Sequence, residues 1–122
     1  MKLRISGNSI RLRLSKSEVE KLSHNGSLEE HALFGKNVFS YALQCKADCS
    51  ELCADFEKGK ITVFIPESFI KDWAENDVIG FDTKMETSNN ELLNILVEKD
   101  FKCLDETEED QSDNYENPNR LC

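Results

Sequence analysis

The sequence predicts a single α+β domain that is mostly antiparallel β, with about eight strands and two short helices. Three observations predict it: short runs of alternating apolar and polar residues, Gly-containing turns between these runs, and an internal repeat. Alternation over about four to eight residues is typical of strands with one buried face. At 122 residues the chain can form one core. We expect a strongly curved sheet or a closed barrel.

The internal repeat joins residues 9–22 to residues 60–73, fifty-one positions later in the chain. In both copies an alternating run leads into an amphipathic helical run. The matching apolar positions are Ile10 and Ile61, Leu12 and Val63, Leu14 and Ile65, Val19 and Ile70, and Leu22 and Trp73. Two ββαββ units, covering 1–46 and 51–102, would therefore account for all the strands and helices.

The first hairpin is predicted around Gly7-Asn8, a pair suited to the positive φ angles of a two-residue turn. This turn places Ile5 opposite Ile10 and Leu3 opposite Leu12. A helix over about 15–24 follows, because Ser15 and Glu18 form a capping-box pattern and Gly26 is a suitable stop. Residues 27–34 and 37–45 then form a second hairpin around Gly35-Lys36-Asn37.

The second half repeats this order. Residues 51–57 and 60–65 form a hairpin around Lys58-Gly59, with Phe56 opposite Ile61. Pro66 suits the first turn of a helix, and Phe69, Ile70 and Trp73 give that helix an apolar stripe. A fourth hairpin joins 78–86 to 91–102 across Ser88-Asn89-Asn90.

Composition narrows the function classes. A formal net charge of −9 argues against non-specific nucleic-acid binding, which requires a basic surface. Seven of the acids lie in residues 105–122, which we interpret as a flexible acidic tail after a domain that ends near residue 104. No run of apolar residues is long enough for a membrane span, and Met1 leads directly into Lys2-Leu3-Arg4-Ile5 without a secretory signal. We therefore expect a cytoplasmic protein.

The strongest indication of a site is a basic stripe on the first hairpin. Its four members are Lys2, Arg4, Arg11 and Arg13. The predicted register places Arg4 opposite Arg11 and Lys2 opposite Arg13, and like charges in such positions repel. We expect an anionic or phosphorylated small ligand to bind there. Two other interpretations stay open: the stripe is solvated surface, or the acidic tail lies on it.

Two carboxylates near the end of the last strand are candidate metal ligands. Glu98 and Asp100 share the parity of Lys102, opposite to that of Ile95 and Val97. If the sheet closes with its apolar face outward, these carboxylates and the arginines would line a tunnel. Such a tunnel could hold Mg²⁺ or Mn²⁺ and a phosphorylated substrate; otherwise no cofactor is expected.

The five cysteines do not indicate a disulfide scaffold, because their number is odd. Cys45, Cys49 and Cys53 are spaced by four residues, and on one helix they could bind a metal. The predicted strands separate them, and zinc sites usually contain a tighter pair. We therefore expect reduced thiols.

Two stretches resemble a family of short uncharacterised bacterial proteins. They are Ile10-Arg11-Leu12-Arg13-Leu14-Ser15-Lys16-Ser17-Glu18-Val19 and Ile95-Leu96-Val97-Glu98-Lys99-Asp100-Phe101-Lys102-Cys103-Leu104-Asp105, with Asp110-Gln111-Ser112-Asp113-Asn114-Tyr115 after the second. The resemblance covers essentially the whole chain and implies no activity.

A weaker resemblance is to the adenylate-cyclase/thiamine-triphosphatase (triphosphate tunnel) superfamily. Arg11-Leu12-Arg13-Leu14 is similar to its arginine-bearing strand, and Glu98-Lys99-Asp100-Phe101-Lys102 is similar to its Glu-x-Glu-x-Lys signature. This resemblance implies an eight-stranded barrel with charged residues inside.

Three functional hypotheses follow. The first is a module that binds a small anionic ligand through the basic stripe. The second is a metal-dependent hydrolase of a phosphoanhydride, in which Glu98 and Asp100 hold the metal and the arginines stabilise developing charge. The third is a protein-interaction module with no small ligand, for which we expect an exposed apolar patch or sheet edge.

Overall fold

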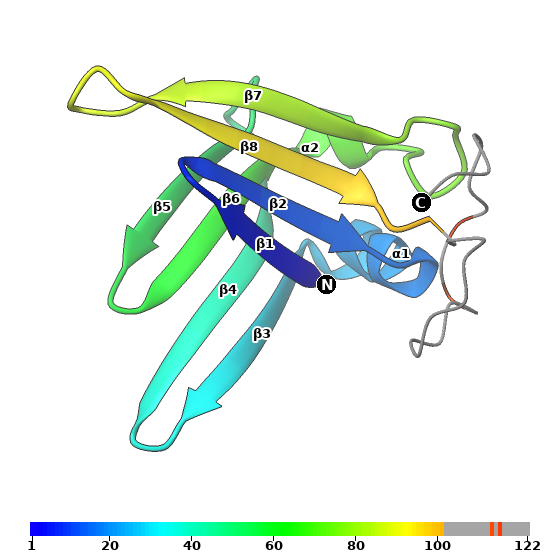
Figure 1. The fold of residues 1–122 in the computed structure, drawn as a ribbon. Helices are drawn as coiled ribbons and strands as arrows, with labels where there is room; N and C mark the ends of the chain where they lie inside the picture. The colour runs from blue at the N-terminus through cyan, green and yellow to red at the C-terminus, as the bar shows by residue number, and fades with distance from the viewer. Residues whose placement is uncertain (102–112, 114, 116–122) are drawn as a thin grey trace.

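The computed structural model describes residues 1–101, Asp113 and Tyr115. Within them, eight strands and two helices follow one another in the predicted order (Figure 1). Their bounds are β1 (Lys2–Ser6), β2 (Ser9–Leu14), α1 (Lys16–Asn25), β3 (Ser27–Phe34), β4 (Asn37–Lys46), β5 (Cys53–Glu57), β6 (Lys60–Pro66), α2 (Glu67–Ile70), β7 (Gly80–Glu86) and β8 (Leu92–Lys99). The predicted α+β class, with mostly antiparallel strand pairs, is confirmed.

The strands form two four-stranded sheets rather than one. Sheet A has the order β1-β2-β8-β7, and sheet B has the order β3-β4-β6-β5. In each sheet the two outer pairs are antiparallel hairpins, and the central pair, β2–β8 or β4–β6, is parallel. Each sheet therefore combines one hairpin from each half of the chain.

The chain passes from one sheet to the other through the segments that contain the two helices. α1 carries the chain from β2 in sheet A to β3 in sheet B, and α2 with the turns after it carries the chain from β6 back to β7. The two halves also pair in matching registers. Ile10 on β2 lies beside Ile95 on β8, and its repeat partner Ile61 on β6 lies beside Tyr41 on β4. This agreement is what a duplicated ββαββ unit would produce.

The core lies between the two sheets. All ten apolar positions of the repeat are at most 8% exposed, and Leu12, Leu14, Val63 and Ile65 are among the most deeply buried. Leu22 on α1 and Trp73 after α2 are both fully buried. The Trp73 indole Nε1 donates to the Val78 carbonyl oxygen at 2.8 Å, so the largest core side chain is also satisfied as a donor.

Most local predictions are confirmed by the registers and caps. Ile5 pairs with Ile10 across Gly7-Asn8, and Phe56 pairs with Ile61 across Lys58-Gly59. α1 has the predicted capping box, in which the Ser15 backbone N–H donates to Glu18 Oε1 at 2.9 Å. Gly26 ends the helix with a φ of 78°, a left-handed conformation that glycine adopts without strain.

The second helix is shorter than predicted. α2 ends at Ile70, and Trp73 lies in the turns that follow it. Asp72 has a φ of 64°, which no α-helix accommodates, and the Trp73 backbone N–H bonds the carbonyl of Ile70 only three residues back. Trp73 is still buried in the core, although it lies in a turn and not in a helix.

The prediction of a closed barrel with a charged tunnel is wrong. The strands of the described residues form no closed barrel, and the apolar faces of sheets A and B face each other. Arg11, Arg13 and Glu98 therefore lie on the outer face of sheet A. Two sheets that bury their apolar faces against each other form an apolar core, so the charged face of each sheet points outward.

Two further observations bear on the sequence predictions. Residues 105–122, interpreted as an acidic tail, lie outside the described residues except for Asp113 and Tyr115. No helix in the described part of the chain has the length and apolar character needed to cross a lipid bilayer.

The orientation of sheet A can be tested with two neighbouring residues on β2. Leu12→Ala should lower the free energy of unfolding by about 2–5 kcal/mol, because Leu12 is only 1% exposed and its truncation leaves a cavity. Arg11→Ala, the control on the opposite face, should cost less than about 1 kcal/mol. Urea unfolding of both variants measures the difference, and the reverse order would mean that the charged face points inward.

Candidate functional site

The four basic residues of the predicted stripe lie together on the outer face of sheet A. On the β1–β2 hairpin Lys2 pairs with Arg13 and Arg4 pairs with Arg11, as the sequence predicts. On the other side of β2, Arg13 lies beside Glu98 of the parallel strand β8. The stripe is thus continuous from the edge strand β1 to the centre of the sheet.

Carboxylates from β8 and the residue after it pair with three of these cations. Arg13 Nε lies 2.8 Å from Glu98 Oε1, and Arg11 Nε lies 3.6 Å from the same oxygen. Lys2 Nζ lies 3.1 Å from Asp100 Oδ2, whose residue is 6% exposed. These contacts relieve the repulsion between like charges in opposite positions on the hairpin.

The metal role predicted for Glu98 and Asp100 gains no support from their surroundings. Their ion-pair partners are the cations Lys2, Arg11 and Arg13. No three His, Cys, Asp or Glu residues of the described chain come together as a possible metal site. In this arrangement the two carboxylates act as counter-ions.

Arg4 differs from the other three cations. It is exposed, it lies opposite Arg11, and it makes no ion pair with any other described residue. Its guanidinium group is therefore the member of the stripe most available to an anion in solution.

A lysine that the sequence reasoning missed is buried at the end of β8. Lys99 is 3% exposed, and its Nζ donates to the Asn76 carbonyl oxygen at 2.7 Å. The same Nζ lies 5.7 Å from the Trp73 ring centre and 4.8 Å from the Tyr115 ring centre. Burial lowers the pKa of Lys99. The sequence does contain a signal for this burial: Lys99 follows Ile95 and Val97 at every second position of β8, so it lies on the buried face of the strand.

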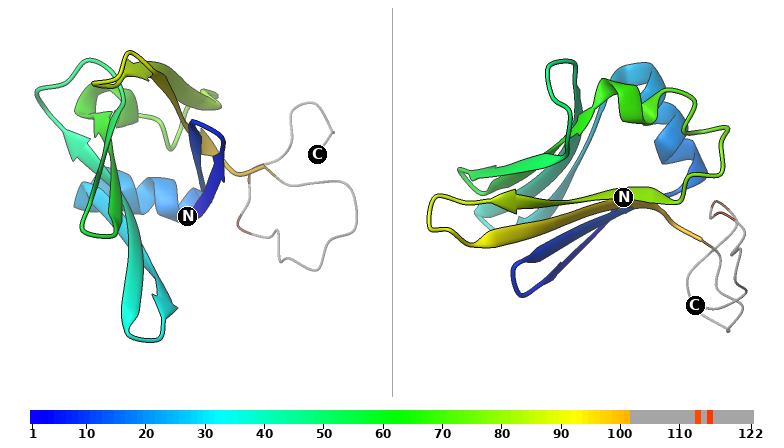
Figure 2. Two further views of the ribbon diagram at one scale, coloured as in Figure 1. Left: turned by 60° about the vertical axis from the view of Figure 1, so that its left-hand side comes forward. Right: turned by 90° about the horizontal axis from the view of Figure 1, so that it is seen from above.

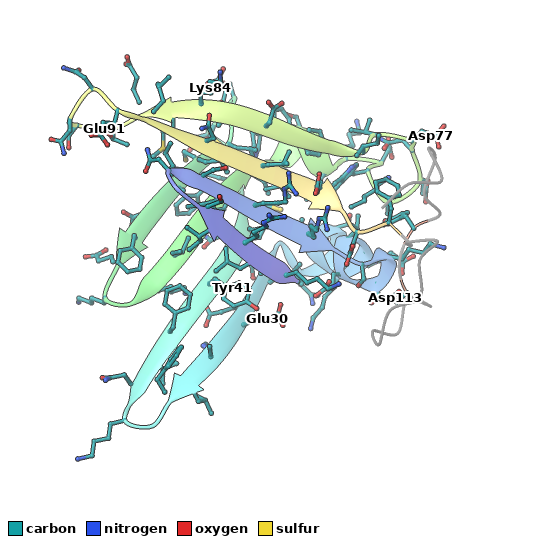
Figure 3. The ribbon with its side chains drawn as sticks, viewed as in Figure 1. Glu30, Tyr41, Asp77, Lys84, Glu91 and Asp113 are labelled. Carbon is teal, nitrogen blue, oxygen red and sulfur yellow. The ribbon has the colours of Figure 1, made fainter. Side chains whose placement is uncertain are left out.

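Asp113 binds the first turn of α1 rather than the basic stripe. Ser17 Oγ donates to its carboxylate at 2.6 Å, and the Lys16 backbone N–H donates to its carbonyl oxygen at 3.0 Å. The Tyr115 N–H bonds the Asp100 carbonyl oxygen at 2.7 Å. Figure 3 shows Asp113 beside α1. The hydrogen bond from Ser17 is the main reason that the pKa of Asp113 is lowered.

The three described cysteines are all free and partly buried. Cys45 lies on β4, Cys53 on β5, and Cys49 in the connection between these strands. Burial, with a smaller contribution from the Glu67 carboxylate, raises the pKa of the Cys45 thiol to about 11. Cys45 is therefore neutral near pH 7 and poorly nucleophilic.

An apolar cleft that the sequence reasoning missed lies between the two sheets. Its volume is about 490 Å³, and it opens to solvent. Six apolar residues of its lining form three pairs in matching positions of the two halves: Ile5 and Phe56, Ile10 and Ile61, and Phe39 and Leu93. Phe56 and Ile5 are 65% and 54% exposed, so the cleft presents large apolar side chains to water.

The cleft follows from the shape of the sandwich. The four hairpin turns lie on the side of the molecule away from both helices, where the sheets diverge (Figures 1 and 2). Leu22 and Trp73 fill the space between the sheets near the helices, whereas residues of the strands and of the β1–β2 turn line it near the turns. The alternation of apolar residues that forms the core therefore continues along the strands, beyond the part of the interior that Leu22 and Trp73 fill.

Comparisons with known proteins give one result. A family model described as "Family of unknown function (DUF7009)" matches residues 1–119. No curated protein and no solved structure matches the chain.

The contact between Ser17 and Asp113 predicts a pH effect. Because the pKa of Asp113 is lower when folded, this carboxylate stabilises the fold above its ordinary pKa of 3.8 and loses that effect as the pH falls through the lowered value. Ser17→Ala should raise the pKa of Asp113 toward 3.8, which carboxyl-carbon NMR titration measures. Ser23→Ala, exposed on the same helix, is the control, and an unchanged Asp113 titration in Ser17→Ala would contradict the contact.

Proposed function

The chain belongs to a family of unknown function, DUF7009, and we propose that it is a binding module that holds an apolar segment of a partner in the cleft between sheets A and B. The observation that carries this proposal is the exposure of large apolar side chains at the mouth of a defined hollow. Scattered apolar residues on a surface need no explanation, but a contiguous apolar concavity marks a binding site.

The size and lining of the cleft suit this role. Its volume of about 490 Å³ lies within the range of ligand sites, roughly 300–1,000 Å³. Aromatic and branched side chains from both sheets line it, including Ile5 from sheet A and Phe39 and Phe56 from sheet B. Burying one such side chain against a partner contributes about 1.5–3 kcal/mol.

The position of the cleft also favours a polypeptide partner. β1 and β5 are edge strands of sheets A and B, and both contribute lining residues, Ile5 from the first and Phe56 from the second. Their outer edges carry backbone groups that no neighbouring strand of the same sheet pairs. An extended segment in the cleft could thus gain main-chain hydrogen bonds as well as apolar contacts.

A second candidate function is the binding of a small anion to the basic stripe. The observation that favours it is Arg4, which is exposed opposite Arg11 and makes no ion pair with another described residue. Glu98 competes for Arg11 and Arg13, so an anion would have to displace a carboxylate or bind beside it. The stripe lies on the open outer face of sheet A, which provides less enclosure than the cleft.

The cleft can be probed with Nile red, a neutral apolar dye. Phe56→Ser should weaken dye binding by about tenfold or more, because it removes one large apolar wall of the cleft. Val78→Ser is the matched control, since Val78 is 40% exposed and does not line the cleft. Fluorescence titration gives both affinities. Equal binding by the two variants, or no binding by the wild type at a dilution at which it is monomeric, would contradict the proposed site.

The anion candidate predicts opposite effects for two substitutions. Arg4→Ala should weaken pyrophosphate binding, whereas Glu98→Gln should strengthen it by about threefold to fivefold, because it removes the carboxylate charge that competes for Arg11. The shift of the melting temperature with pyrophosphate concentration measures each affinity. Lys71→Ala, an exposed lysine next to α2, is the control. A shift that is absent, or the same in all variants, would mean that the stripe is solvated surface.

A further inference from the structure

We propose that the occupant of the cleft is the β3–β4 hairpin of a second copy of this chain. Each copy of the resulting dimer inserts its hairpin into the cleft of the other. This inference rests on the proposed function of the cleft and names its partner. A reciprocal contact of this kind is an isologous, two-fold interface, the commonest arrangement of soluble oligomers.

The tip of the β3–β4 hairpin is apolar and exposed. Leu33 is 78% exposed, Phe34 is 66% exposed and Val38 is 49% exposed. The turn between β3 and β4 lies on the same side of the molecule as the other hairpin turns, and the hairpin extends away from the helices (Figure 1). β4 pairs with β6 from Ser40 to Lys46 and contributes Phe39 to the lining, so the hairpin is held as part of one wall of the cleft of its own chain.

The other half of the chain provides an internal control for this tip. The registers of β2–β8 and β4–β6 make Val38 equivalent to Leu92, and the hairpin registers then make Leu33 equivalent to Glu86. The next position holds Phe34 in one hairpin and Thr87 in the other. The fold therefore does not require apolar residues there, and the β3–β4 tip has them for another reason.

Charge complementarity connects the tip to the cleft. Lys36 lies in the turn of the β3–β4 hairpin, and Asp55 lies on β5 between Ala54 and Phe56, at the rim of the cleft. Both are exposed, and neither makes an ion pair with another described residue. When Phe34 of one copy enters the cleft of the other, Lys36 is carried toward a rim that holds an unpaired carboxylate.

The test is the oligomeric state of the full chain in solution, measured by sedimentation equilibrium over concentrations up to the millimolar range. The wild type should form dimers. The tip variant Leu33→Ser/Phe34→Ser and the cleft variant Phe56→Ser should each raise the dissociation constant at least about tenfold. Leu92→Ser, at the equivalent place on the other hairpin, is the matched control and should leave it unchanged.

Charge reversal gives a second and more specific readout. Lys36→Glu should weaken the dimer, because it places two carboxylates together. The double variant Lys36→Glu/Asp55→Lys restores an opposite pair and should recover most of the wild-type association. A merely structural role for Lys36 would not predict that recovery.

Nile red binding by the same samples separates this inference from the proposed function. In the tip variant the cleft is released, so the dye should bind more than it does to the dimeric wild type. A wild type that stays monomeric, or a dimer insensitive to tip and cleft substitutions, would overturn the second copy as occupant. If the dye still binds and Phe56→Ser still weakens it, the cleft remains a docking site for another segment. If the tip variant binds no dye, the docking site itself is refuted.

Discussion

The structure depends on the parallel pairing of β2 with β8 and of β4 with β6. Each of these pairs joins strands from different halves of the chain, so neither half has a complete sheet of its own. The inward residues of the four strands, among them Leu12, Leu43, Val63 and Val97, are nearly or completely buried. Burial of this kind is the main favourable contribution to folding. The helices, the hairpins and both candidate surfaces take their positions from this central arrangement.

The similarity of the two halves also separates positions that the common fold requires from positions that it does not. Positions in the core match closely, as Leu22 and Trp73 do in burial although not in size. Matching cleft positions are both apolar, as with Ile5 and Phe56. The hairpin tips differ, since Leu33 and Phe34 stand where the other half has Glu86 and Thr87. A difference between equivalent positions has no explanation in the common fold, so it points to an interaction that only one of the hairpins makes.

Much of the fold could be predicted from the sequence because local signals are strong. Alternation, the Gly7-Asn8 and Lys58-Gly59 turns and the capping box at Ser15 gave the strands, registers and α1 nearly as observed. The division into two sheets could not be predicted, because alternation fixes which face of a strand is apolar but not which strand lies beside it. For the same reason the basic stripe was found while its direction, inward or outward, was not. The cleft was missed because it exists only where two sheets diverge. Glu98 and Asp100 were predicted as metal ligands because the sequence does not show that they pair with the cations of the stripe.

The most direct measurement is an isotope-filtered nuclear Overhauser experiment on a mixture of labelled and unlabelled chains. It reports contacts between protons of different copies and separates them from contacts within one copy. The account predicts intermolecular signals from the Phe34 ring of one chain to the methyl groups of Ile5 and Ile61 of the other, with Ile10 and Ile61 close together inside each chain. If Phe34 shows no intermolecular contact, and the Ile5 and Ile61 methyl groups contact only their own chain, the central claim that the open end is a docking site for a second copy is wrong.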